Sequence, residues 1–242
     1  MSAAPRILDA GEAALVVEFG TSVDPAISDR VLALDDALLA DRPEGIAETV
    51  PTYRSLMIHY DPLVLDRDTL AGRVLALAGG ASKRATAPTR WILPCCYEAP
   101  HGEDLASVAG QIGRTPEQVA ALHAGATFRV YMYGFAPGFA YCGGLPEALA
   151  VPRRPSPRPP HPANAVMIGG GLAAVATVPM PTGWYVLGVT PSRLYAPERA
   201  ESFFVRPGDT IRFEPIDAAT FARLAEREAA GERVARREEG VS

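Results

Sequence analysis

The chain has 242 residues, of which 48% are hydrophobic and 21% are charged, and its formal net charge at pH 7 is −5. This length and composition suit one large or two modest globular domains and exclude an intrinsically disordered chain. The negative net charge disfavours a general nucleic-acid binder, because such binding depends on Lys and Arg side chains that neutralise phosphates. We therefore expect no nucleic-acid partner.

Nothing in the sequence indicates export or membrane insertion. Its N-terminus lacks a basic flank followed by an apolar core and a small-residue cleavage site. The longest apolar stretch, 169–180, is too short to span a bilayer and contains Pro179. An odd number of cysteines (Cys95, Cys96 and Cys142) does not suggest a disulfide framework. We expect a cytoplasmic protein that contacts no membrane.

The N-terminal third of the chain alternates between strand and helix patterns. Apolar residues alternate with others over 15–19 and again over 56–60, which predicts two strands. Apolar residues recur at helical spacing over 27–38 and 70–77, which predicts two helices. This order indicates a small N-terminal α+β domain, residues 1–80, with its sheet covered on one side.

A change of composition separates this domain from the rest. Residues 81–90 lack large apolar side chains and mix Gly, Ser, Thr and Pro, so we predict a linker there. After a short strand at 91–93, two helices are expected, the second with a capping box from Thr115 to Gln118. Short strands separated by Gly and Pro turns then predict a β-barrel or a β-sandwich, within residues 91–216.

The last part of the chain has a turn signal and a helix signal. Pro207 and Gly208 suit the two central positions of a type II turn. Asp217 is expected to cap a C-terminal helix within residues 217–242. The charged sequence from Gly231 onward is expected to fray.

The usual catalytic signatures are absent. The sequence has no phosphate-binding P-loop, no dinucleotide-binding glycine loop and no nucleophile elbow. The histidines are scattered, so we predict no metal site, and no residue can be assigned as catalytic. They are His59, His101, His123 and His161.

Structural roles are favoured for five residues that could otherwise carry chemistry. His123 lies on the apolar face of its helix, which favours a packed, hydrogen-bonded side chain over a catalytic base. Adjacent cysteines such as Cys95 and Cys96 rarely reach the geometry of a bridge, so strand packing is expected of them. Asp104 is expected to be a favourable charge near a helix start, and Asp209 a turn residue.

A run rich in glycine and aromatic residues, 131–146, is the first candidate site. Glycine permits a close approach of backbone to ligand, proline fixes its own φ angle, and aromatic rings provide flat apolar walls. The run can line a small-ligand pocket or a docking groove, or it can be a tight barrel corner with core aromatics. The candidate residues are Tyr131, Tyr133, Gly134, Phe135, Pro137, Gly138 and Phe139.

The second candidate is the segment 151–162, in which half of the residues are proline. It cannot be a helix or a central strand, so we expect an extended, preorganised segment. Arg153, Arg154 and Arg158 are expected to project from it, either to bind a carboxylate or phosphate or simply to keep a loop soluble. A ligand segment for an SH3-type domain is disfavoured, because the segment lies between core elements.

Several motifs in a fixed order resemble the family of the 5-oxoprolinase B subunit. That family includes the sporulation kinase A inhibitor and the allophanate hydrolase subunit 1 type of carboxyltransferase domain. The resemblance extends from about residue 7 to 217. It rests on Pro51-Thr-Tyr-Arg-Ser-Leu, Tyr131-Met-Tyr-Gly-Phe-Ala-Pro-Gly-Phe139, Gly143-Gly-Leu-Pro146, Pro152-Arg153, Pro157-Arg158, Gly183-Trp184, Thr190-Pro191 and Arg206-Pro-Gly-Asp209.

The resemblance implies an α+β domain followed by a cyclophilin-like β-barrel and a C-terminal helix. It also implies two partners, the C-type and A-type subunits of the same enzyme, which with this chain open the lactam ring of 5-oxoproline or another small polar amide. ATP would drive the reaction and would be bound with the partner subunits. The resemblance adds Thr190 to the candidate ligand-binding residues, beside Arg153, Arg158 and the glycine-aromatic run.

Two alternatives stay open within the family. One is a regulatory protein that binds and inhibits a sensor histidine kinase. The other is a carboxyltransferase or allophanate hydrolase-type component that acts on a urea-like amide, which is weaker because nothing in the chain carries biotin.

The chain also departs from the family pattern just after the proline segment. Leu172 and Ala173 replace a Gln-Thr pair, Ala176 replaces a tyrosine, and Val189 replaces an arginine before Thr190. These changes remove hydrogen-bonding groups that a polar substrate would use. They leave open the exact substrate and whether the site is active.

Overall fold

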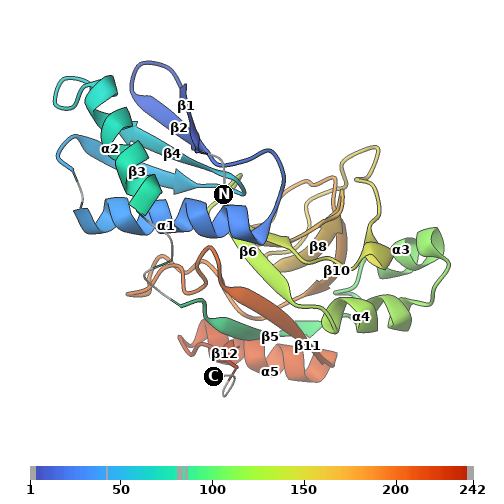
Figure 1. Ribbon diagram of the computed structural model, residues 1–242. Helices are drawn as coiled ribbons and strands as arrows, with labels where there is room; N and C mark the ends of the chain where they lie inside the picture. The colour runs from blue at the N-terminus through green and yellow to red at the C-terminus, as the bar shows by residue number, and fades with distance from the viewer. Residues whose placement is uncertain (1–3, 42, 81–83, 85–86, 239–242) are drawn as a thin grey trace. The chain divides into compact units, whose positions relative to one another are not determined.

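The computed structural model describes residues 4–41, 43–80, 84 and 87–238 (Figure 1). The chain divides into two compact units, Met1–Ala87 and Pro88–Ser242. The division lies inside the segment predicted as a linker, of which residues 81–83, 85 and 86 are outside the described residues. Among the described residues, no helix is both long enough and apolar enough to cross a membrane.

The described part of the first unit is an antiparallel sheet with two helices packed on one face. The strand order is β1-β2-β4-β3. Leu15 and Val17 of β2 and Ile58 of β4 pack with the helices in one buried cluster, so the expected α+β unit with one covered face is confirmed. The elements are β1 (Arg6–Asp9), β2 (Ala14–Glu18), α1 (Pro25–Asp41), β3 (Ile46–Pro51), β4 (Ser55–Tyr60) and α2 (Arg67–Gly80).

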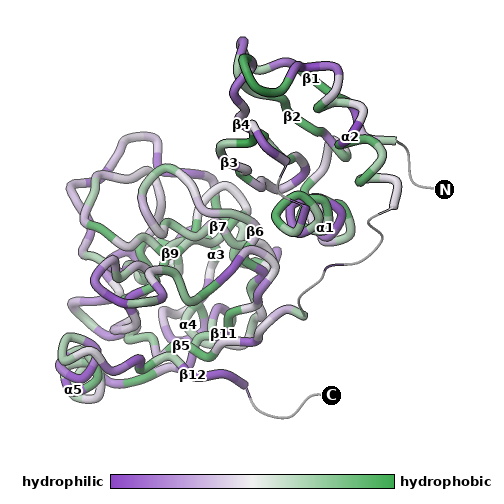
Figure 2. Tube along the Cα trace, turned by 90° about the vertical axis from the view of Figure 1, so that its left-hand side faces the viewer, coloured by the Kyte–Doolittle hydropathy of each residue, from purple (hydrophilic) through white to green (hydrophobic). Residues whose placement is uncertain are grey.

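The second unit contains a closed β-barrel. Its strands are β5 (Arg90–Cys96), β6 (Phe128–Tyr133), β7 (Ala140–Gly143), β8 (Ala165–Gly169), β9 (Leu172–Ala176), β10 (Tyr185–Val189) and β11 (Thr210–Ile216). They follow the order β10-β8-β9-β7-β6-β11-β5, and Val189 of β10 pairs with Cys96 of β5 to close the ring. Closure decides between the two predicted architectures in favour of the barrel, whose strands are rich in hydrophobic residues in Figure 2.

Helices α3 (Leu105–Ile112) and α4 (Pro116–Ala124) lie between β5 and β6, as predicted. The capping box is confirmed, because the Thr115 hydroxyl accepts the Gln118 N–H and the Gln118 side chain accepts the Thr115 N–H. The type II turn is also confirmed. Gly208 has φ 92°, and the Asp209 N–H donates to the Arg206 carbonyl at 3.0 Å.

The end of the chain corrects one expectation. Helix α5 (Ala218–Ala229) is capped by Asp217, as predicted, but residues 231–238 do not fray. They return to the barrel, where β12 (Arg236–Arg237) pairs with β5. The buried carboxylate of Glu228 holds this return, because it accepts the Val234 N–H at 2.9 Å and an Arg199 N–H at 2.8 Å. Residues 239–242 lie outside the described residues.

The cysteines and Asp209 are structural in this fold. Cys95, Cys96 and Cys142 are buried free thiols, and burial raises the pKa of Cys142 to about 12. The expected strand packing of Cys95 and Cys96 is therefore confirmed. Asp209 does more than shape a turn, because its carboxylate also accepts the Thr89 N–H at 2.8 Å and the indole N–H of Trp91 at 3.1 Å.

Candidate functional site

The loop between β6 and β7 is tightly folded and accepts only glycine at one position. Gly138 has φ 73°, and a Cβ atom there would lie 2.5 Å from Cβ of Tyr195 and 2.9 Å from Cγ2 of Thr177. The Thr177 hydroxyl donates to the Pro137 carbonyl, and the Gly134 N–H donates to the Phe139 carbonyl at 3.2 Å. The glycines and proline of this run therefore fix the loop against its neighbours.

This loop and the proline segment form the walls of a cavity of roughly 250 Å³, which we call the Arg153 cavity. Aromatic rings from three parts of the barrel meet in it, and Phe139 lies 4.8 Å from Tyr141 and 6.4 Å from Trp184 between ring centroids. The lining residues are Phe135, Phe139, Tyr141, Arg153, Pro157, Pro181, Thr182, Gly183 and Trp184.

Arg153 is the cation of this cavity. Its guanidinium carbon lies 5.0 Å from the centroid of the Trp184 ring, an arrangement in which the ring face attracts the positive charge. Arg153 forms no ion pair with another described residue. Because five N–H donors sit at the rim of an aromatic pocket, the cavity suits a small ligand that carries a carboxylate.

Arg154 and Arg158 have a different role from the one expected. Both bind Asp104, with Nη1 of Arg154 3.0 Å from Oδ1 and Nη1 of Arg158 2.6 Å from Oδ2. Arg158 also forms an ion pair with Glu103. These two guanidinium groups therefore do not project freely from the segment, because each holds the Asp104 carboxylate of the chain itself. Ligand binding by Arg158 stays a prediction.

Asp104 consequently joins three parts of the second unit. Besides the two guanidinium groups, its Oδ2 atom accepts the Val186 N–H at 2.8 Å, and its own N–H donates to the Val186 carbonyl at 2.9 Å. Asp104 lies at the start of α3, as predicted, but it makes no side-chain cap bond, and its carboxylate is held in this network as well. We call it the Asp104 clamp, formed by Asp104, Arg154, Arg158 and the Val186 backbone.

The proline segment is extended, as predicted, and its backbone is fixed as well. The N–H groups of Arg154 and Arg158 donate at 2.8 Å to the carbonyls of Gly183 and Thr182. These two carbonyls belong to the opposite wall of the Arg153 cavity. The clamp and the backbone bonds thus hold both walls together, with Arg153 beside the anchored residue 154.

Of the ten candidate residues, Phe135, Phe139 and Arg153 line this cavity. Tyr131, Tyr133 and Thr190 are not among its lining residues and have other surroundings. Tyr131 is buried, with its ring against Gly143 and the Arg129 guanidinium. Tyr133 faces the other side of the loop, and its hydroxyl donates to the Val205 carbonyl at 2.8 Å. Thr190 is fully buried just after β10, where its hydroxyl accepts the Ser192 N–H. Burial raises the pKa of Tyr133, which does not favour a role in proton transfer.

The departures from the family pattern fall on two faces of the barrel wall. Leu172 and Ala176 belong to an outer apolar cluster together with Phe139 and Trp184, next to the Arg153 cavity. Ala173 belongs to the barrel interior. The loss of polar groups at Leu172 and Ala176 therefore makes this wall apolar, whereas the change at Ala173 affects packing.

The candidate residues predicted from the sequence did not include Tyr141 and Trp184, which line the cavity. They also did not include Asp104, which holds the proline segment in place. Tyr141 lies inside the glycine-aromatic run, and Trp184 follows a Pro-Thr-Gly turn signal, so both were within reach of the sequence. The role of Asp104 could not be predicted, because no local sequence pattern pairs it with Arg154 and Arg158, which are 50 and 54 positions away.

The second unit is a closed barrel that carries a small cavity with an aromatic wall and one arginine. The model of the family "Carboxyltransferase domain, subdomain C and D" matches residues 5–205. The 5-oxoprolinase B subunit of Escherichia coli O157:H7 is 36% identical over 207 residues, which cover 85% of this chain and 93% of the relative. The chain therefore belongs to the family of the 5-oxoprolinase B subunit and related carboxyltransferase domains.

Two further similarities agree with this family. The 5-oxoprolinase B subunit of Bacillus subtilis (strain 168) is 30% identical over 228 residues, covering 87% of this chain and 92% of the relative. The crystal structure of TTHA0988 is similar with a TM-score of 0.77 and 38% identity over 85% of this chain. This chain spans 40% of the length of that solved chain.

Proposed function

We propose that the chain is the B component of an ATP-dependent 5-oxoprolinase, which opens the lactam ring only together with its C-type and A-type subunits. Its relatives, named as the B subunit of 5-oxoprolinase, support the activity. The observation that carries the proposal is the Arg153 cavity. There an aromatic wall meets a guanidinium that has no ion-pair partner among the described residues.

The cavity is suited to binding but poor in groups that transfer protons. Among the described residues that line it there is no Asp, Glu, His or Cys, and its hydroxyl groups belong to Tyr141 and Thr182. Such a site holds a substrate and leaves general acid and base groups to come from another chain. This composition supports a protein that is not active alone.

5-Oxoproline fits this arrangement by its chemistry. Its carboxylate would pair with the Arg153 guanidinium, and its flat ring would lie against the side chains of Phe139, Tyr141 and Trp184. The apolar Leu172 and Ala176 lie in the cluster behind this wall and add no polar contact. Substrate orientation would therefore depend mainly on the single cation.

The test is co-expression with the C-type and A-type subunits and a measurement of ATP hydrolysis that depends on 5-oxoproline. A complex that assembles but shows no such turnover would contradict the proposal.

Arg153→Ala is expected to raise the KM for 5-oxoproline about tenfold or more, because a charge-assisted hydrogen bond contributes about 1.5–3 kcal/mol. The kcat should change little if Arg153 binds substrate and transition state equally. The KM of Arg153→Lys should lie between those of the wild type and Arg153→Ala, because lysine keeps the positive charge but lacks the planar set of N–H donors. The exposed Arg114 supplies the matched control, and Arg114→Ala should leave KM unchanged.

A further inference from the structure

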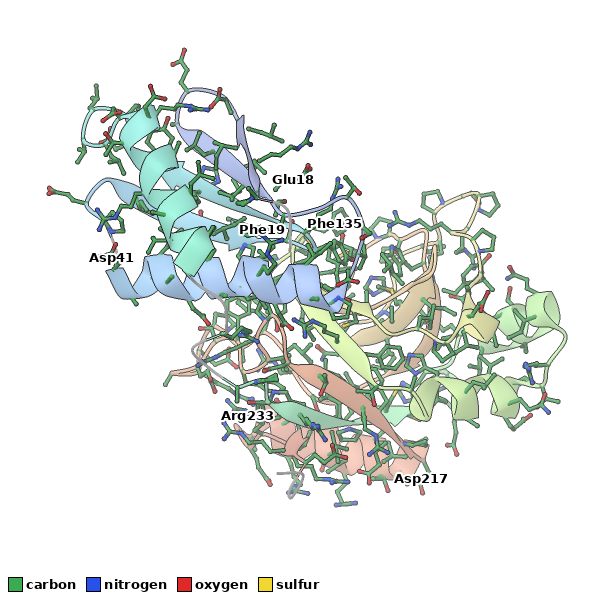
Figure 3. The ribbon with its side chains drawn as sticks, in the orientation of Figure 1. Glu18, Phe19, Asp41, Phe135, Asp217 and Arg233 are labelled. Atoms are coloured by element: carbon green, nitrogen blue, oxygen red, sulfur yellow. The ribbon has the colours of Figure 1, made fainter. Side chains whose placement is uncertain are left out.

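The loop that follows β6 holds one bulky side chain in a conformation that bulky residues rarely adopt. Phe135, labelled in Figure 3, has φ 68°, in the left-handed region that favours glycine. The Ala136 N–H donates to the Gly134 carbonyl at 2.8 Å, which makes Phe135 the central residue of a three-residue turn. Such turns are rare and strained when the central φ is positive. The conformation of Phe135 therefore costs the folded chain free energy.

Hydrogen bonds on both sides of the turn impose this conformation. The Phe139 N–H donates to the Ala136 carbonyl at 3.0 Å, and the Gly134 N–H donates to the Phe139 carbonyl at 3.2 Å. A strained residue persists only where its surroundings fix it in this way, and such residues cluster at functional sites. The strain at Phe135 thus points to a role for its side chain.

Burial does not offset the strain in the free chain. The Phe135 side chain is 79% exposed, so most of its apolar surface is in contact with water. Hydrophobic stabilisation is proportional to the apolar area removed from water, and here little of that area is removed. The phenyl ring would gain its full stabilisation only from a molecule that covers it.

The Arg153 cavity is where a ligand would cover this ring. Of the four aromatic residues that line the cavity, Phe139 and Trp184 are buried, whereas Phe135 is exposed. The rings of Phe135 and Phe139 lie 5.8 Å apart between centroids, with an interplanar angle of 76°. They therefore bound the cavity on two sides, nearly at right angles. A flat ligand held by Arg153 would remove the Phe135 ring from water.

The composition of the cavity separates a cyclic substrate from its ring-opened product. Hydrolysis of the lactam adds water to 5-oxoproline and yields glutamate, which carries an ammonium group and a second carboxylate. Among the described residues that line the cavity, Arg153 is the one cation and no side chain is acidic. The additional charges of glutamate have no partner there, so their desolvation would oppose binding. The acyclic chain also has no flat ring for Phe135 to cover.

We propose that Phe135 is a specificity-determining residue of the Arg153 cavity, which covers the flat ring of the substrate and lets the acyclic product leave. The identity of the substrate rests on the proposed function. Phe135 takes no part in bond breaking, because a phenyl ring transfers no proton. Its contribution is to binding, and it favours cyclic monocarboxylates over acyclic amino acids.

The test is isothermal titration calorimetry of the full chain with 5-oxoproline, pyrrole-2-carboxylate and glutamate. Pyrrole-2-carboxylate has a flat five-membered ring and one carboxylate but no lactam to open. The wild type should bind both ring ligands about tenfold more tightly than glutamate. Phe135→Asn should weaken both ring ligands about fivefold and leave glutamate unchanged, because only the ring ligands lose an aromatic contact.

Melting temperatures of the same variants separate a ligand-binding role from a structural one. Phe135→Asn should melt no lower than the wild type, because asparagine tolerates a positive φ better than phenylalanine does. Phe135→Tyr keeps an aromatic ring and should retain the affinity for both ring ligands. The matched control is Phe203→Leu, at a phenyl ring that is 40% exposed but does not line the Arg153 cavity. It should leave all three affinities unchanged.

Three outcomes would overturn the proposal. The first is that the wild type binds neither ring ligand at millimolar concentration, or that Phe135→Asn binds both as tightly as the wild type. The second is that Phe135→Asn weakens glutamate as much as the ring ligands. The third is that Phe135→Asn melts well below the wild type, so that the ring serves the fold.

Failure of the proposed function has a different signature. A reconstituted complex without turnover that depends on 5-oxoproline would contradict that function. Binding of pyrrole-2-carboxylate that depends on Phe135 would still assign this residue its role, with another cyclic carboxylate as the substrate.

Discussion

Replacing Asp104 with alanine is expected to lower the free energy of unfolding of the second unit by about 3 kcal/mol, the low end of the cost of breaking a buried ion pair. The change leaves the Arg154 and Arg158 guanidinium groups and the Val186 N–H without their shared acceptor. We expect the low end of this range because the Arg154 side chain is 29% exposed, so water partly solvates its charge when Asp104 is removed.

The same change should raise the KM for 5-oxoproline about tenfold in the assembled enzyme, if loosening of the proline segment displaces Arg153. Asp104 touches no ligand in this scheme, so it acts as a positioning residue. Amide hydrogen exchange at residues 154 and 158 should speed up, because their bonds to residues 182 and 183 lose the support of the clamp.

Urea unfolding followed by tryptophan fluorescence measures the stability, since both tryptophans, Trp91 and Trp184, lie in the second unit. Asp104→Asn keeps an acceptor oxygen and should lose only about 1–2 kcal/mol. Glu198→Ala removes an exposed ion pair with Arg193 and should cost less than about 1 kcal/mol. If Asp104→Ala and Glu198→Ala lower the free energy of unfolding by the same amount, the Asp104 clamp stabilises the second unit no more than an exposed ion pair does.

The elements that could be predicted from the sequence are those with one or two buried faces. β4 alternates between buried and partly exposed residues along its whole length, and this alternation is the signal that predicts a strand. The edge strands β1 and β3 contain no fully buried residue and show no such alternation. Their positions depend on pairing with β2 and β4, which is tertiary information.

The same distinction between local pattern and tertiary information applies to the candidate site. Arg153, Arg154 and Arg158 could be located from the sequence, because a proline-rich segment between core elements must be extended. The carboxylate that Arg154 and Arg158 bind could not be located from the sequence, because Asp104 is 50 residues from Arg154 and 54 from Arg158. Similarly, periodicity placed His123 on an apolar helix face, but the rings that enclose it come from β6 and β11.

The arrangement of cations narrows the chemistry of the Arg153 cavity. Three free arginines on one segment would suit a multiply charged anion, whereas Arg154 and Arg158 are paired with the carboxylates of Asp104 and Glu103. One guanidinium beside an apolar wall suits a monoanion of modest size.

The second large effect is a pH dependence of stability that originates at His123. This side chain is fully buried on α4, with Nδ1 2.8 Å from the Tyr97 hydroxyl and its ring 4.7 Å from Phe128 and 5.0 Å from Phe213. Burial lowers its pKa to about 3. The folded chain therefore keeps His123 neutral where the unfolded chain, with a pKa near 6.5, binds a proton.

The sign of the effect follows from this difference in proton binding. Above pH 6.5 both states hold a neutral imidazole and His123 adds no pH dependence. Below pH 6.5 the free energy of unfolding should fall by up to about 1.4 kcal/mol per pH unit, until the folded imidazole protonates near pH 3. At pH 5 the loss from this residue should amount to roughly 2 kcal/mol.

Urea unfolding at pH 7.5, 6.5, 5.5 and 5 would measure this loss, with His123→Gln as the variant that cannot protonate. Gln keeps a polar atom for the Tyr97 hydroxyl, and its lower stability at pH 7.5 should largely converge with that of the wild type as the pH falls. His101 and His161 also have pKa values lowered by burial, so part of the pH dependence should survive in the variant. If the difference in free energy of unfolding between the two proteins stays the same from pH 7.5 to pH 5, His123 takes up its proton in the folded chain as readily as in the unfolded chain. The aromatic rings around it would then tolerate the charged imidazolium.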